Sequence, residues 1–219
     1  MRVYYLTGAQ YGLSDLALRR VKIARFADLN DPFELLAVDL RDPALRRAFQ
    51  ETKEQINADK GLICVSRYWE NPLIWGHYAE KHTGLALGLE IPDRLLARVH
   101  YAKTPVRIRS RRGNASELFS ERMMNRLLRT KFYDWRYEDE LRLFVQLDEA
   151  TRESGLYFCD FSEDFRLREV VLGPRCELPI EGVRRLVRDL EPEVDVVKSR
   201  IAYSSFRVIR DRAASRTRR

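Results

Sequence analysis

The chain has few of the residues on which most familiar enzyme classes depend. Its 219 residues include three cysteines and three histidines, and no two of them have the spacing of zinc ligands. The sequence also contains no P-loop, no Gly-x-Gly-x-x-Gly and no Gly-x-Ser-x-Gly. These absences argue against zinc enzymes, P-loop nucleotidases, dinucleotide-fold dehydrogenases and serine hydrolases. We therefore expect no metal cofactor.

Long apolar runs are also missing. No run approaches the ~20 residues that a membrane-spanning helix needs, and the first residues are typical of a strand, not of an apolar signal segment. The cysteines, Cys64, Cys159 and Cys176, are odd in number and far apart in the sequence, which favours reduced thiols over a disulfide framework. We expect a cytoplasmic protein that does not enter a membrane.

Positive charge is concentrated in two places. The net charge is +7, and the last stretch, from Arg207 to Arg219, contains six arginines and one aspartate. A second basic stretch begins with Arg98, ends with Arg112 and contains no acidic residue. Both stretches would attract phosphate, so nucleic acid is a candidate partner. The alternative is that they are solvated faces that keep the protein in solution.

Apolar periodicity predicts both helices and strands, so the expected fold class is α+β. We predict a single domain over residues 1–212, with mixed or antiparallel β-sheets flanked by helices, and a basic, disordered tail at 213–219. Strands are expected at 2–7, 21–26, 62–66, 85–91, 137–145, 156–161, 169–172, 194–197 and 203–209. Helices are expected after Ser14, from Pro43 to Gly61, from Pro72 to Gly84, after Ser116 and over 180–190.

The stretch 137–145 carries the most informative polar pattern. Apolar residues alternate there with Glu138, Glu140 and Arg142, as in a half-buried strand. Two carboxylates about 7 Å apart on one face raise each other's pKa if the site is partly dry, and a neighbouring arginine keeps at least one of them ionised. The alternative is a solvated sheet face that contains an ion pair.

Two other stretches combine polar and aromatic residues. Residues 30–34 form a shaped loop in which Pro32 fixes one backbone angle and Phe33 can act as an apolar anchor. Residues 72–84 read as a helix with an aromatic face. Each stretch can present side chains to a cleft, and each can be purely structural, as a pinned turn or as part of the core. The candidate binding residues from these stretches are Asn30, Asp31, Glu34, Trp75, Tyr78 and His82.

Three stretches together, 30–34, 75–84 and 135–142, resemble a bacterial family catalogued as domain of unknown function 2971. The segments Tyr4-Tyr5-Leu6 and Val171-Leu172-Gly173-Pro174 are similar as well, so the resemblance covers about residues 3–175. The family name implies no activity. It does imply that the polar residues of the separate motifs converge on one cleft. Those residues are Asn30, Asp31, Glu34, Tyr78, His82, Glu138, Glu140 and Arg142.

A looser resemblance connects the chain with ADP-ribosyltransferase-like toxins. The strand that contains Tyr5 and Thr7 is similar to the opening strand that holds NAD in those enzymes, although Tyr5 stands where they usually have His or Arg. Glu138-Asp139-Glu140 is similar to their Glu-x-Glu pair. The resemblance implies a split β-sandwich, with Glu140 as the catalytic carboxylate and Glu138 as its partner. It also implies that Trp75 or Tyr78 stacks on nicotinamide and that arginines bind the pyrophosphate.

Three functions follow as hypotheses. The first is an NAD-consuming transferase or glycohydrolase, with NAD as its substrate and a role as an effector in phage defence or a toxin–antitoxin system. The second is a phosphodiester-acting or nucleic-acid-binding protein that holds a divalent metal with Glu138, Glu140, Asp31 and His82. The third is a non-catalytic or antitoxin-like module in which the charged row is structural. The sequence leaves the oligomeric state open.

Overall fold

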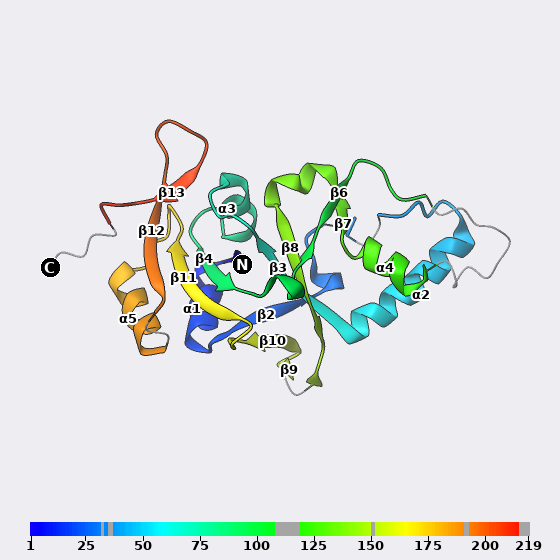
Figure 1. Cartoon of the computed structure of the whole chain (residues 1–219), viewed down its shortest axis with the longest axis horizontal. Helices are drawn as coiled ribbons and strands as arrows, with labels where there is room; N and C mark the ends of the chain where they lie inside the picture. Colours follow the sequence, from blue (N-terminus) through cyan, green and yellow to red (C-terminus); the bar gives the residue numbers. More distant parts are fainter. Residues whose placement is uncertain (32, 35–36, 108–118, 150–151, 191–192, 215–219) are drawn as a thin grey trace.

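A mixed β-sheet forms the centre of the molecule, and helices cover it on both faces (Figure 1). The computed structural model describes residues 1–31, 33–34, 37–107, 119–149, 152–190 and 193–214. Over these residues the fold is α+β, as the sequence predicts. None of the helices in the described ranges is long and apolar enough to cross a membrane.

The strands of the main sheet follow the order β13-β12-β11-β4-β1-β3-β2-β10-β9, and β8 pairs with both β3 and β5. β11 and β12 are parallel, whereas the other pairs of this sheet are antiparallel. A separate parallel pair joins β6 (His100–Ala102) to β7 (Thr130–Phe132). The strands of the main sheet are β1 (Arg2–Thr7), β2 (Arg20–Arg25), β3 (Lys60–Ser66), β4 (Leu85–Glu90), β5 (Ala97–Arg98), β8 (Glu140–Gln146), β9 (Arg152–Glu153), β10 (Leu156–Asp160), β11 (Arg166–Leu172), β12 (Asp195–Ile201) and β13 (Val208–Arg210).

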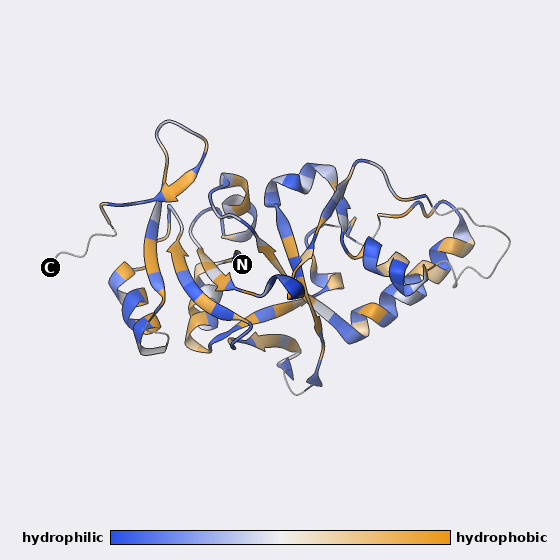
Figure 2. Cartoon of the chain, viewed as in Figure 1, coloured by the Kyte–Doolittle hydropathy of each residue, from blue (hydrophilic) through white to orange (hydrophobic). Residues whose placement is uncertain are grey.

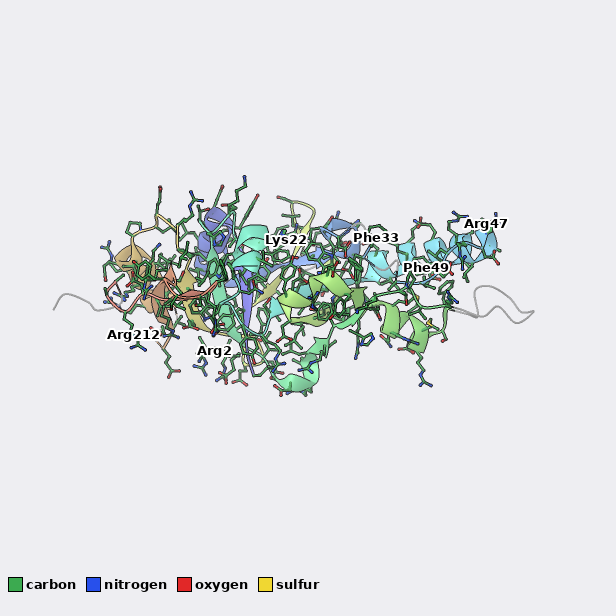
Figure 3. The ribbon with its side chains drawn as sticks, turned by 90° about the horizontal axis from the view of Figure 1, so that it is seen from above. Arg2, Lys22, Phe33, Arg47, Phe49 and Arg212 are labelled. Atoms are coloured by element: carbon green, nitrogen blue, oxygen red, sulfur yellow. The ribbon has the colours of Figure 1, made fainter. Side chains whose placement is uncertain are left out.

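The helices divide between the two faces and one end of the sheet. α1 (Ala9–Ala17) and α5 (Ile180–Leu190) contact each other, while α3 (Pro72–Tyr78) packs near β1. α2 (Pro43–Asp59) and α4 (Glu121–Leu127) lie together beyond β8 (Figure 1). Figure 3 places Arg47 of α2 and Arg212 towards opposite ends of the long axis, with Lys22 near the middle. Three short 3₁₀ helices are η1 (Phe26–Asp28), η2 (Asp93–Leu95) and η4 (Tyr133–Glu138).

Alternate residues of β4 pack into apolar clusters on opposite faces of the sheet. Leu85, Leu87 and Leu89 belong to the largest apolar cluster, whereas Ala86 belongs to the cluster that contains Trp75 of α3. Figure 2 shows the corresponding apolar residues along the central strands. Because both faces of β4 are covered, burial fixes its register. β1 pairs with β4 from Arg2 to Thr7, so the position of β1 is fixed as well. Its residues can therefore form one wall of a cavity.

The sheet opens where β3 leaves β1. The two strands pair only at Tyr4 and Ser66, whereas β3 pairs with β8 along its whole length, from Lys60 to Ser66. β2 pairs with β3 only at Ala24 and Arg25. Beyond these short pairings, β3 diverges from β1 and β2. Side chains occupy the space between the strands, where no backbone ladder closes it.

Several sequence predictions need correction at their boundaries. Ser14 does not begin a helix, because α1 already starts at Ala9 and contains Ser14. The helix predicted from Pro72 to Gly84 ends at Tyr78, because residues 80–82 have positive φ angles. Residues 137–138 belong to η4 and not to the strand, which starts at Glu140. The helix start predicted at Ser116 lies outside the described residues.

The basic tail is only partly described. The backbone N–H groups of Ala213 and Ala214 donate to Asp211 Oδ1, at 3.0 and 3.3 Å. These two residues therefore form a turn, whereas the sequence predicts disorder from residue 213. Residues 215–219 lie outside the described part.

Removal of the Asp42 side chain should destabilise α2. Its carboxylate accepts hydrogen bonds from the N–H groups of Ala44 at 2.8 Å and Leu45 at 3.4 Å, which would otherwise lack partners at the helix start. We expect Asp42→Ala to lower the free energy of unfolding by about 1 kcal/mol in urea denaturation, and Asp42→Asn to lower it by less than half as much. Equal stability of all three proteins would contradict this role.

Candidate functional site

The opening between β1 and β3 contains a cavity of about 290 Å³. β1, β2, β3 and β8 contribute to its walls, together with Tyr78 at the end of α3 and Lys131 on β7. The cavity combines apolar and aromatic walls with a few charged groups, as ligand pockets in proteins commonly do. The lining residues are Tyr4, Tyr5, Leu6, Lys22, Ala24, Asp28, Leu29, Asn30, Glu34, Leu62, Ile63, Cys64, Val65, Ser66, Tyr78, Lys131, Glu138, Glu140 and Arg142.

Five charged side chains of alternating sign form a buried chain at the cavity wall, which we call the charge ladder. Its members, in order, are Glu138, Lys131, Glu140, Arg142 and Glu34, and each is no more than 6% exposed. Lys131 Nζ contacts Glu138 Oε2 at 2.6 Å and Glu140 Oε2 at 3.1 Å. Arg142 Nε contacts Glu140 Oε1 at 2.8 Å. Because the charged groups are buried, these contacts must compensate for the loss of their hydration.

Arg142 is the most completely paired member of the ladder. Its Nη1 and Nη2 donate to the two carboxylate oxygens of Glu34, at 2.7 and 3.0 Å, and Nη1 also donates to Leu128 O at 2.7 Å. A planar guanidinium suits such a two-pronged contact. Arg142 therefore holds the loop that carries Glu34 against β8. Its side chain has little capacity left to bind a ligand.

Backbone geometry brings Glu138 to the cavity from a different element than Glu140. Glu138 is the last residue of η4, and Asp139 after it has a left-handed conformation with φ 43°. Aspartate adopts this conformation more readily than most residues. Ser66 Oγ donates to the carbonyl of Glu138 at 2.7 Å. The turn and this hydrogen bond fix Glu138 beside the strand pair β3 and β8.

Two tyrosine hydroxyls hold Glu138 and the backbone of Glu140 in place. The Tyr78 hydroxyl donates to Glu138 Oε1 and accepts from Asn30 Nδ2 at 3.1 Å. The Tyr101 hydroxyl accepts from the backbone N–H of Glu140 at 2.8 Å. Tyr78 thus links Glu138 to Asn30, and these contacts connect all three sequence motifs.

The two carboxyl groups differ in acidity. Burial raises the pKa of Glu138 to about 7, and Lys131 opposes that rise only in part because Glu140 shares its ammonium group. Burial also disfavours ionisation of Glu140, but Arg142 and Lys131 outweigh it and lower its pKa to about 2. At neutral pH, Glu140 is a fixed anion, whereas Glu138 can exchange a proton. Pairs of carboxyls separated in this way are common in acid–base catalysis.

Lys22 is a cationic lining residue of the cavity whose side chain has no ionic partner among the described residues. Its ammonium group makes no described hydrogen bond or ion pair, in contrast to the charged groups of Lys131 and Arg142. Lys22 is a half-buried residue of β2 and lines the cavity together with Asp28. An ammonium group without a partner can bind an anionic group of a ligand.

Seven of the eleven residues expected at the site line the cavity, and four do not. Trp75 is fully buried in the core, and its indole N–H donates to Trp69 O at 2.6 Å. The backbone carbonyl of His82 accepts from the N–H of Arg175 at 3.0 Å, away from the cavity. Asp31 bonds to the N–H of Phe33 at 2.9 Å and shapes its own loop. Thr7 is buried at the end of β1. The residues that do converge are Tyr5, Asn30, Glu34, Tyr78, Glu138, Glu140 and Arg142.

Lys131 and Lys22 were not selected from the sequence. Lys131 pairs with Glu138 and Glu140 from a different strand, and no periodicity within one element signals such a contact. Its Nζ also lies 4.8 Å from the centre of the Trp135 ring. The only local signal was a lysine placed directly before the aromatic residues Phe132 and Tyr133. The sequence contains no local signal for Lys22, because the alternation of β2 does not distinguish it from a solvent-facing lysine.

The carboxylates of the ladder are not arranged as a metal site. Within the residues that the structure describes, no group of three or more His, Cys, Asp or Glu side chains could hold a metal ion. The oxygens of Glu34 and Glu140 already accept from Arg142 and Lys131. The three cysteines form no disulfide. The metal-dependent hypothesis would require these ion pairs to break.

The basic stretch from Arg98 to Arg112 is described as far as Arg107. Arg98 ends β5 and pairs in register with Leu141 of β8. None of Arg98, Lys103 and Arg107 lines the cavity, and Arg109, Arg111 and Arg112 lie outside the described residues.

Comparisons of the chain with models of protein families, with curated proteins and with solved structures find no match.

Glu138 should titrate near neutral pH. Its pKa in the folded protein, about 7, lies above its ordinary value of 4.5, so the folded state binds this proton more tightly than the unfolded state. The contribution of Glu138 to the free energy of unfolding should therefore fall as pH rises from about 4.5 to about 7. An infrared band of a protonated carboxyl should disappear with a midpoint near pH 7. Burial raises the pKa of Asp15 to about 7 as well, so Glu138→Gln should lose part of that band and keep the part from Asp15, whereas Glu153→Gln, at an exposed carboxylate, should keep the whole band. A midpoint below pH 5 in the wild type would contradict the assignment.

Proposed function

We propose that this protein is an NAD-consuming enzyme that cleaves the bond between nicotinamide and ribose and transfers ADP-ribose to water or to another acceptor. The observation that carries the proposal is the pair Glu138 and Glu140, two buried carboxyls of different acidity at the wall of one cavity. A fixed anion beside a proton-exchanging carboxyl suits a reaction that builds positive charge on a sugar and then needs a base.

The geometry favours Glu138 over Glu140 as the group that meets the substrate. The oxygens of both carboxyls accept hydrogen bonds, but those of Glu140 accept from the cations Lys131 and Arg142, which keep it ionised. Glu138 is held by Tyr78 and Lys131 and has the pKa of a base that works near neutral pH. We therefore assign proton transfer to Glu138 and the positioning of Lys131 to Glu140, which reverses the roles that the sequence resemblance implied.

The reaction can be written with these groups alone. The C1′–N bond of the ribose breaks, and its electron pair goes to the nicotinamide ring, which leaves as a neutral molecule. Ionised Glu138 stabilises the positive charge that develops on the ribose. An acceptor hydroxyl or water forms the new C1′–O bond, and its proton passes to Glu138.

The size of the cavity sets which part of NAD would bind there. A volume of about 290 Å³ is at the lower end of the range for ligand pockets, ~300–1,000 Å³. We therefore place nicotinamide and its ribose in the cavity and the adenylate outside it. Tyr78 and Tyr5 are the rings available to nicotinamide, because Trp75 lies in the core.

We also propose a family, a cellular compartment and a biological role for this activity. We keep the assignment to the family of unknown function 2971, on the motifs that converge on the cavity. The three reduced cysteines suit the cytoplasm. An enzyme that consumes NAD there would act as an effector in phage defence or in a toxin–antitoxin system.

Glu138→Gln should abolish turnover while NAD binding persists. Calorimetry should give a dissociation constant within about threefold of wild type, and nicotinamide release should fall by at least about 100-fold, because the base is lost. Wild-type kcat should rise with pH through about 7, as Glu138 ionises. Glu149→Gln, at an exposed carboxylate that follows β8 and pairs with Arg152, should leave both quantities unchanged. Folded wild-type protein that binds no NAD at about millimolar concentration would reject the proposed function. Turnover that survives in Glu138→Gln and is lost in Glu140→Gln would restore the reverse assignment.

Lys22→Gln should weaken binding of ligands that carry phosphate. Lys22 is the cavity's unpaired cation among the described residues, so we expect it to contact the pyrophosphate of NAD. The variant should bind NAD about tenfold more weakly and bind nicotinamide riboside, which has no phosphate, as wild type does. Lys60→Gln, at an exposed lysine of β3 outside the cavity, is the matched control. An equal loss for both ligands would assign Lys22 to the general shape of the cavity.

A further inference from the structure

The hairpin loop between β12 and β13 displays two large aromatic side chains. Tyr203 and Phe206 are 95% and 97% exposed, and the loop extends beyond the end of the sheet (Figure 1). A single exposed aromatic residue is ordinary, but two on one short loop form an apolar surface that has no partner within the described chain. We call residues 202–207 the aromatic loop.

The aromatic loop is ordered by its own backbone. The N–H of Ala202 donates to Arg207 O at 2.9 Å, and the N–H of Arg207 donates to Ser205 O at 2.9 Å. The N–H of Val208 donates to Glu70 O at 2.8 Å, which ties the base of the loop to the segment before α3. The two rings are therefore presented on a fixed backbone, and their burial by a partner would cost little conformational entropy.

One side of the loop borders an open hollow of about 600 Å³. Phe206 and Arg207 line it on one side, and Tyr68, Leu73 and Tyr137 line it as well. Tyr68 and Leu73 are themselves more than half exposed. The hollow thus offers aromatic rings from three separate segments to a flat ligand. Stacking on such rings requires a planar group that is not already stacked, such as an unpaired nucleobase.

Guanidinium groups accompany these rings. The Arg200 guanidinium lies 4.9 Å from the centre of the Tyr203 ring, and the Arg67 guanidinium lies 5.4 Å from that of Tyr68. Arg207 is at the end of the loop, where the sequence begins its run of six arginines with one aspartate. Three acids line the hollow, and each faces a cation: Glu70 lies 3.7 Å from Arg207 and Asp139 lies 3.7 Å from Arg67, whereas Glu138 is paired with Lys131. Arg200 has no acidic partner among the described residues and donates only to Ile201 O, so it leaves positive charge in excess beside Tyr203.

From these features we propose that the aromatic loop and the adjoining hollow bind single-stranded nucleic acid. Unpaired bases stack on Tyr203, on Phe206 and in the hollow, and the phosphates lie against Arg200 and Arg207. A duplex is a poor ligand because its bases are already stacked and face inwards. The hollow borders Glu138 of the charge ladder, but the proposed binding does not depend on NAD consumption.

The test uses the full chain and a fluorescein-labelled oligothymidylate of about 12 nucleotides, within the range of ~4–16 that comparable single-strand sites cover. Fluorescence anisotropy should show binding that weakens as salt is raised. The double substitution Tyr203→Ser, Phe206→Ser should weaken binding by about tenfold or more, since each stacked base contributes roughly 5- to 150-fold. Tyr11→Ser removes an aromatic residue that is 66% exposed on α1 and should change nothing.

Arg207→Gln provides a second, independent variant. It should weaken binding and reduce the slope of log affinity against log salt by about one, as the loss of one phosphate contact requires. Thermal unfolding of each variant verifies that the fold is intact. The proposal is overturned if the wild type does not bind the oligonucleotide at low salt, if it binds duplex equally well, or if the double substitution has no effect. It is also overturned if the double substitution abolishes self-association in sedimentation experiments and leaves oligonucleotide binding intact, because the loop would then be a protein contact.

Discussion

The structure depends most on the burial of five charges in a single chain of contacts. Moving an ion out of water costs several kcal/mol even after relaxation, and here three carboxylates, one lysine and one arginine are buried together. Each contact offsets part of that cost only while its neighbour is present. The charge ladder therefore fixes the relative positions of β8, β7, η4 and the loop that carries Glu34. Apolar residues often stabilise such a space as well as ion pairs do, so stability alone does not account for the ladder.

The position of the charge ladder is connected with the opening in the sheet. β3 pairs fully with β8 but meets β1 at only one residue pair, so the sheet has a gap that backbone hydrogen bonds do not close. The charged side chains occupy one wall of that gap, and Tyr4, Tyr5 and Leu6 form another. The result is a cavity with a polar wall and an apolar wall. Such a cavity can orient a ligand with a flat ring at one end and a sugar at the other.

The sequence predicted the parts of this fold that local rules determine. β1 was predicted with its exact bounds, and the Asp42-Pro43 start of α2 was confirmed because capping is a local interaction. Seven residues of the expected site also meet at the cavity. Glu138 was placed on the strand, but it ends a 3₁₀ helix because Asp139 turns the chain there. Lys131 was missed because its contacts join separate elements, and the solvated sheet face considered for Glu140 and Arg142 is instead buried.

The sharing of Lys131 between two carboxylates has a consequence for how binding and protons are linked. A positively charged ring placed beside Glu138 would favour its ionised form, so a molecule that binds at pH 7 would expel part of a proton into the buffer. An anionic ligand in the same place would take up a proton instead. The sign of the proton exchange thus reports the charge of the ligand that lies against Glu138, whichever molecule that ligand is. Proton release or uptake on binding therefore distinguishes cationic from anionic ligands without any turnover.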